Sequence, residues 1–156
     1  MNKKGFHASS IDIINEIDLN WDWSQTVQQR ELGEGIYFCI EEIESIAKEH
    51  SLIFANKIYY YPLAVLSANI CLDNSDRVID FNSEQFNDVV SLFQKDKKKY
   101  TDHEIIIMIV QKLIKDKKID AVTGTLHKKG VHSKFMNLSS PSLIKRNTIG
   151  RVSRYE

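Results

Sequence analysis

The sequence predicts a single α+β domain that spans residues 1–156. The expected helices lie between groups of expected strands, without the regular strand–helix alternation of a doubly wound fold. A chain of 156 residues fits one domain with a sizeable hydrophobic core. The chain has only two prolines, and it has neither an internal repeat nor a Pro/Gly-rich linker, so nothing in it marks a domain boundary.

The first elements expected are one helix and a long loop. Ser9 or Ser10 can cap a short helix with three isoleucines near one face. These isoleucines are Ile11, Ile14 and Ile17. Residues 18–32 contain two tryptophans and few periodic apolar positions, so they are predicted to form a loop. A loop of that length in a compact domain is usually functional or mobile.

The rest of the chain mixes strands and helices. A strand is expected over 36–40, a helix that acids open over 41–50, and two or three strands across 57–72. Two capping pairs predict further helices: Asn82 with Gln85, and Thr101 with Glu104 before Ile105–Ile114. Finally, strands are expected over 119–126 and 135–139, separated by a Lys-Lys-Gly turn at 128–130.

Composition points to a globular protein of the cytoplasm. Apolar residues make up 42% and charged residues 27%, and no run approaches the roughly 18 apolar residues that a membrane span needs. The N-terminus lacks the apolar stretch of a signal peptide. Cys39 and Cys71 lie inside apolar runs, which favours buried thiols in a reducing compartment over a disulfide. Histidines outside the motifs below have no metal-ligand spacing, so no metal site is expected.

Charge is distributed unevenly although the net charge is zero. Residues 1–50 carry four Lys/Arg and ten Asp/Glu, whereas residues 121–156 carry seven Lys/Arg and one Glu. The two ends could attract each other or simply face solvent. Alternatively, the basic end could bind phosphates, either of a dinucleotide or of a nucleic acid.

Two short motifs suggest a chemistry. Gly5–Ser10 has the sequence Gly-Phe-His-Ala-Ser-Ser, and Gly33–Phe38 has Gly-Glu-Gly-Ile-Tyr-Phe. Glycines let the backbone approach a ligand closely or take positive φ. Together the motifs resemble the nicotinamide-binding half of ADP-ribosyltransferases, in the branch of poly(ADP-ribose) polymerases and small bacterial toxins. The resemblance implies a split, mainly antiparallel sheet with flanking helices around a cleft for NAD.

The resemblance also implies roles for individual residues. His7 would bind the ribose 2′-hydroxyl, the backbone of Ala8 the carboxamide, and the ring of Tyr37 would stack on the nicotinamide. Ala8 stands where the family usually has glycine. Ser9 would lie near the adenosine side, and Gly35 would line the cofactor site. The imidazole of His7 and the phenol of Tyr37 are therefore expected to converge on one pocket.

The match continues past Tyr37 and then weakens. Ser45 stands eight residues after the tyrosine, at the spacing of a family serine that contacts the carboxamide. Lys48 replaces a second stacking tyrosine. Ser140–Lys145 resembles the closing section of small transferases, which places the family's catalytic glutamate near Lys134 or Phe135, and neither of these is acidic.

Three explanations of the missing glutamate stay open. The chain could be a mono-transferase that works without the acid. It could borrow an acid from the loop, the candidates being Asp22, Glu31 and Glu34. It could also have lost its chemistry and kept only the scaffold. Separately, Asn137 is polar and near the relevant strand, so it is a candidate for contact with the ribose. Taken alone, His7 and Tyr37 would be an ordinary histidine and a strand residue, so only the joint pattern points to NAD.

The expected function is therefore NAD-dependent transfer of ADP-ribose to a macromolecule, either protein or nucleic acid, RNA included. NAD is the substrate. The resemblance suggests a bacterial or phage-related toxin of a toxin–antitoxin or anti-phage system, with an antitoxin protein as a candidate partner. The alternatives are a catalytically inactive binding module of the same fold and a nucleic-acid-binding protein unrelated to NAD.

Overall fold

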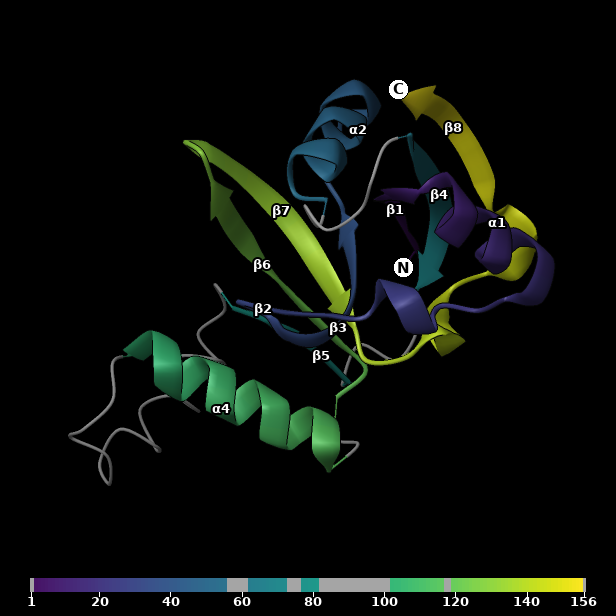
Figure 1. Ribbon diagram of the computed structural model, residues 1–156. Helices are drawn as coiled ribbons and strands as arrows, with labels where there is room; N and C mark the ends of the chain where they lie inside the picture. Colours follow the sequence, from purple (N-terminus) through teal and green to yellow (C-terminus); the bar gives the residue numbers. More distant parts are fainter. Residues whose placement is uncertain (1, 56–61, 73–76, 82–101, 117–118, 156) are drawn as a thin grey trace.

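The computed structural model describes residues 2–55, 62–72, 77–81, 102–116 and 119–155 (Figure 1). Its main elements are β1 (Asn2–Ser10), α1 (Ile11–Asn20), β2 (Gln28–Arg30), β3 (Gly33–Cys39), α2 (Glu44–Ile53), β4 (Leu63–Cys71), β5 (Val78–Asp80), α4 (Asp102–Lys115), β6 (Ala121–Lys128), β7 (Val131–Leu138) and β8 (Gly150–Tyr155). Short 3-10 turns lie at Ser24–Thr26, Pro141–Leu143 and Arg146–Thr148. The expected α+β class is confirmed.

One sheet organises the molecule. Its strands follow the order β5-β6-β7-β3-β1-β4-β8, and β2 pairs with β3 outside this path. All the strand pairs given for the described residues are antiparallel except β5 with β6. Strands far apart in the sequence thus become neighbours, as β3 and β7 do, and as β4 and β8 do.

The sheet opens between β1 and β3. These two strands share the single residue pair Phe6–Cys39, whereas β1 pairs with β4 along its whole length. On its other side, β3 pairs with β7 from Ile36–Leu138 to Cys39–Phe135. Figure 1 shows β6 and β7 diverging from β1, β4 and β8. The predicted split, mainly antiparallel sheet with flanking helices is confirmed.

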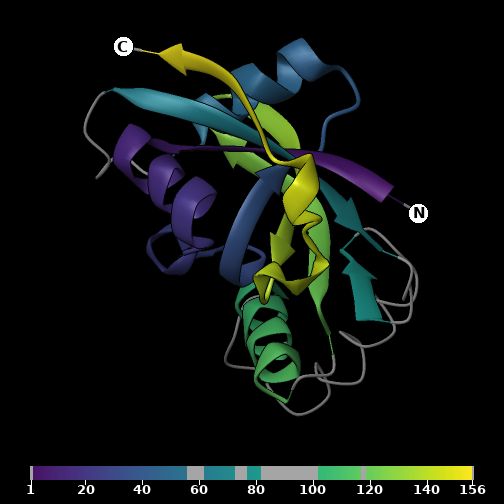
Figure 2. The same cartoon turned by 90° about the vertical axis from the view of Figure 1, so that its right-hand side faces the viewer.

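Two hydrophobic cores cover opposite faces of the sheet. One contains Tyr37 and Phe135 and packs against α2 through Ala47. The other contains Phe38 and packs against α1 through Ile14 and Ile17. Successive side chains of a strand point to opposite faces, so neighbouring residues of β1 and β3 belong to different cores. This alternation decides which motif residues can meet. Figure 2 shows α1 and α2 from a second side.

Helix α1 begins as predicted. The Ser10 hydroxyl accepts a hydrogen bond from the Ile13 N–H at 3.4 Å, which satisfies one of the unpaired donors of the first turn. The helix ends at Asn20, and Trp21 follows in the left-handed conformation with φ of 54°. This conformation is sterically unfavourable for a non-glycine residue, so surrounding structure must hold Trp21 in it.

The prediction of one loop over 18–32 is wrong in part. Within these residues, α1 ends, a 3-10 turn forms at Ser24–Thr26, and β2 pairs with the first residues of β3. The Asp22 carboxylate accepts hydrogen bonds from the N–H and hydroxyl of Ser24, which stabilises the turn. Strand β2 was missed because its sequence, Gln-Gln-Arg, carries no alternation of apolar and polar residues.

Other boundaries moved by a few residues. Strand β3 begins earlier than expected, and α2 begins three residues later. Strand β4 fills residues 63–71 of the range 57–72 in which two or three strands were expected, and residues 57–61 of that range lie outside the described residues. Strand β8 was not predicted. The β6–β7 hairpin turns at Lys129 and Gly130, which both have positive φ, as a type I′ hairpin turn requires. The helix predicted after Asn82 and the cap at Thr101 lie outside the described residues.

The described helices include none with the length and apolar character required to cross a membrane.

Candidate functional site

His7 lies in the middle of β1, beside the opening of the sheet. Its side chain is 3% exposed, and Nδ1 lies 2.8 Å from the carbonyl oxygen of Tyr37 on β3. The imidazole packs against Trp23 and Phe38, with ring centroids 6.3 and 5.8 Å away. The two sequence motifs, thirty residues apart, therefore meet through a side chain and a backbone carbonyl.

This contact determines the tautomer of His7. A carbonyl oxygen only accepts hydrogen bonds, so Nδ1 carries the proton and donates. Burial lowers the pKa of the imidazole, although the bond to the Tyr37 carbonyl opposes that effect. In the neutral ring Nε2 is then an acceptor, and no partner for it exists among the described residues. The site thus offers a fixed, buried acceptor that suits a hydroxyl group.

Folding stability should depend on this imidazole below pH 6.5. Because its folded pKa lies below that of the unfolded chain, the unfolded state binds the extra proton as the pH falls. Stability from neutral His7 is full above the unfolded pKa and falls as the pH drops through the folded pKa. Urea unfolding at pH 7.5 and 5.5 should show this loss, with a slope of up to about 1.4 kcal/mol per pH unit.

The slope should become smaller in His7→Leu, which does not titrate. It should persist in His127→Leu, because His127 is exposed on β6. Equal slopes for the original chain and His7→Leu would show that His7 is not buried in its neutral form.

Tyr37 is held by its own turn. The phenol donates a hydrogen bond to the Gly33 carbonyl and accepts one from the Leu32 N–H at 3.1 Å. It is 3% exposed, and burial is the main cause that raises its pKa. Its ring packs with Ala8 and Phe135 in the core under α2, whereas His7 packs with Trp23 in the other core. The structure therefore does not bring the phenol and imidazole into one pocket, contrary to expectation.

Asn137 and Gly35 also contribute to the packing around residues 32–35, which the Tyr37 phenol binds. The Asn137 amide donates to the carbonyls of Leu32 at 2.9 Å and Glu34 at 3.3 Å, and the residue is 1% exposed. A methyl group on Gly35 would overlap the Asn137 side-chain oxygen and the Leu138 carbonyl oxygen. Glycine is thus required at position 35 because the strands pack too closely for a side chain. Asn137 was expected to contact ribose, but its amide group binds the backbone of residues 32 and 34 instead.

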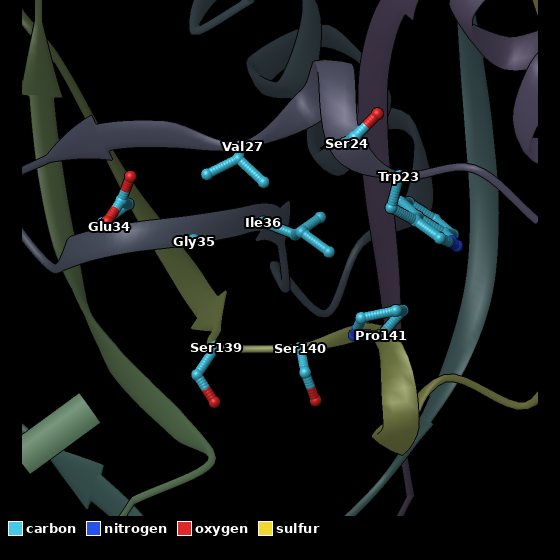
Figure 3. A pocket seen from close by; sticks show the side chains of 9 residues that line it. All are labelled: Trp23, Ser24, Val27, Glu34, Gly35, Ile36, Ser139, Ser140 and Pro141. Carbon is cyan, nitrogen blue, oxygen red and sulfur yellow. The ribbon is translucent and has the colours of Figure 1, made fainter. Parts of the chain in front are cut away.

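A cavity of about 320 Å³ lies on the Trp23 side of β3 (Figure 3). Val27 and Ile36 lie on one side of it and Pro141 on the other. Its remaining lining residues are Trp23, Ser24, Glu34, Gly35, Ser139 and Ser140. The cavity thus brings together the second motif and the Ser-Pro segment that resembles the closing section of transferases.

Ser9 and Trp23, which lie on the His7 side of the sheet, each have one buried polar atom without a partner among the described residues. Ser9 is on the same face of β1 as His7, because their positions differ by two, and it is 0% exposed. Neither the Ser9 hydroxyl nor Trp23 Nε1 has a hydrogen-bond partner within the described ranges. Leaving a buried donor or acceptor unpaired costs about 1–3 kcal/mol. An acceptor, a hydroxyl and a donor on one face form a surface suited to a polar ligand.

The other predicted binding residues are placed differently. Ala8 is buried in β1, on the face that packs with Tyr37. Ser45 is exposed near the start of α2 and lines neither of the described cavities. Among the described residues, no cluster of three His, Cys, Asp or Glu could hold a metal ion.

The three acids that could replace the missing glutamate differ in their surroundings. Phe135, one of the two positions near which the resemblance would place the acid, packs against Phe54 with centroids 4.9 Å apart. Asp22 is engaged by Ser24, and Glu31 lies 3.7 Å from Arg30. Glu34 is exposed and lines the cavity. Of Asp22, Glu31 and Glu34, only Glu34 lines the cavity.

Trp23 is the residue that sequence reasoning missed. It links the cavity to His7, yet it was treated only as part of a loop. The available signal was the presence of both tryptophans of the chain, Trp21 and Trp23, in one predicted loop. Large aromatic side chains in a loop need a partner, which here is the buried face of β1 and β3.

No protein-family model, curated protein or solved structure matches this chain.

Proposed function

We propose that this protein transfers ADP-ribose from NAD to a macromolecular acceptor and releases nicotinamide. The observation that carries the proposal is His7, a buried imidazole fixed across the open sheet with an unpaired acceptor nitrogen. A ribose hydroxyl is the donor that this nitrogen fits. The resemblance of the two motifs assigns the same hydroxyl to His7.

The reaction breaks the bond between C1′ of the ribose and the nicotinamide nitrogen, and the bonding electron pair leaves with nicotinamide. C1′ then bonds to an oxygen or nitrogen of the acceptor, whose proton is released to a base. Positive charge develops on the ribose, so orientation of its hydroxyls and a nearby carboxylate favour the transition state. His7 supplies the orientation, and Glu34 supplies the carboxylate at the cavity. Tyr37 positions His7 through its carbonyl.

The acceptor is a protein or a nucleic acid in the cytoplasm. Lys145 and Arg146 are exposed, and the Arg146 guanidinium lies 5.2 Å from the centre of the Trp21 ring. This basic surface favours an acceptor that carries phosphates, such as RNA. The resemblance to bacterial toxins extends the proposal to a toxin–antitoxin or anti-phage system, with an antitoxin as partner.

Nicotinamide release tests the proposal. Purified protein with NAD and cell lysate should release nicotinamide and label protein or nucleic acid. His7→Leu should slow release by about 100-fold, the order of loss expected when the reacting ribose is misplaced by about 1 Å. His127→Leu, an exposed histidine on β6, should retain the original rate. Equal rates in the two variants, with both folded by circular dichroism, would contradict the role of His7.

A binding module of the same fold is the second candidate. The absence of an acid favours it, because neither Lys134 nor Phe135 is acidic, Phe135 packs in an aromatic pair, and residues 121–155 contain no Asp or Glu. The module would bind NAD saturably without releasing nicotinamide on protein, RNA or DNA. Calorimetry and the release assay, run on the same preparation, separate the two candidates.

A further inference from the structure

The cavity beside β3 stops short of the polar groups that would hold a ligand. Its volume of about 320 Å³ lies at the small end of ligand pockets, which span about 300–1,000 Å³. A dinucleotide is larger than the ligands that fill such a space. His7 and Ser9 are 3% and 0% exposed, and neither lines this cavity.

Trp23 lies between the cavity and His7. It lines the cavity, and its ring also contacts the imidazole of His7 edge-on, at 6.3 Å between centroids and 67° between planes. Figure 3 shows the indole extending away from Val27 and Ile36, with its nitrogen at the far end of the ring. The open space and the buried polar face are thus two sides of one aromatic ring.

The Trp23 backbone is anchored, but its ring has no polar anchor. The Trp23 carbonyl accepts hydrogen bonds from the N–H and the hydroxyl of Thr26, at 3.0 and 2.6 Å. Indole Nε1, in contrast, has no acceptor among the residues that the structure describes. Rotation of the side chain therefore breaks no hydrogen bond of the ring and leaves the turn in place.

We propose that Trp23 is a gate, and that its displacement joins the cavity to His7 and Ser9, which then bind the cis-diol of a ribosyl group. This proposal rests on the proposed function. A cis-diol matches the two groups: one hydroxyl donates to the acceptor nitrogen of His7, and its neighbour exchanges a hydrogen bond with the Ser9 hydroxyl. Ligand binding then satisfies polar atoms that are unpaired in the closed state.

The chain allows a direct test, because Trp21 and Trp23 are its only tryptophans. In Trp21→Phe, all tryptophan emission comes from Trp23. Addition of ADP-ribose, which carries the diol without the reacting bond, should shift this emission to longer wavelength and increase its quenching by acrylamide, both saturably. The matched variant Trp23→Phe, which retains Trp21, should show neither change. His7→Leu in the Trp21→Phe chain should lose the shift.

The possible outcomes separate this proposal from the proposed function. A shift with ADP-ribose but no nicotinamide release from NAD supports the gate and contradicts the transferase. Nicotinamide release with unchanged Trp23 emission supports the transferase and overturns the gate. Failure of NAD and ADP-ribose to bind, measured by calorimetry, overturns the gate. Nicotinamide riboside and adenosine, as separate probes, show which ribose of the dinucleotide occupies the site.

Discussion

Gly35→Ala is expected to destabilise the protein by about 3 kcal/mol, near the upper end for an overpacked position. A methyl group at this position would overlap the Asn137 side chain and the backbone carbonyl of Leu138. The carbonyl cannot move without separating β3 from β7, because Ile36 and Leu138 are a paired position of that ladder. At about 2–4 °C per kcal/mol for a chain of this size, Tm should fall by about 6–12 °C.

Gly130→Ala is the matched control. Gly130 has φ of 78°, but no atom lies within 4 Å of the added methyl group. Only the strain of a left-handed alanine remains there, about 1–2 kcal/mol. Thermal melts of the two variants should therefore differ clearly. Equal losses of Tm would show that the close approach of β7 does not make Gly35 less tolerant of a methyl group than the uncrowded Gly130.

The two sequence motifs show why part of the site could be predicted from the sequence and part could not. The sequence motif identified the glycine turn, and the contact of His7 with the Tyr37 carbonyl confirms that the two motifs are neighbours. Which face each side chain takes depends on strand register, and one position changes the face. Residue 37 pairs with Asn137 and therefore packs under α2, on the face opposite His7.

In the fold, too, the elements set by local sequence patterns could be predicted, and those set by distant contacts could not. The start of α1, the β6–β7 hairpin and the class of the sheet could be predicted, because capping, turn chemistry and grouped elements are local patterns. Strand β2 could not, because Gln-Gln-Arg carries no apolar alternation, and β8 could not, because it forms by pairing with β4, far away in the chain. The role of Trp23 depends on the same distant packing, which no local pattern encodes.

Phe38→Ala is expected to destabilise the fold by about 3–5 kcal/mol, since the ring is 0% exposed and its loss leaves a cavity. Phe135→Ala should have a similar effect on stability, because Phe135 is also buried in β7. Urea unfolding of both variants, compared at equal m-values, measures these losses. The pair removes the same side chain from opposite faces of one sheet.

Binding of NAD should distinguish the two variants. Phe38 flanks both His7 and Trp23, with centroids 5.8 and 5.7 Å away, whereas Phe135 packs against Phe54 in the core under α2. Loss of Phe38 frees the imidazole and the indole, so the Kd for NAD should rise about tenfold or more, equivalent to about 1.4 kcal/mol. Phe135→Ala should bind as the original chain does, when both are measured by calorimetry below their melting temperatures. A larger loss of affinity in Phe135→Ala would place the dinucleotide on the α2 face, beside the phenol of Tyr37.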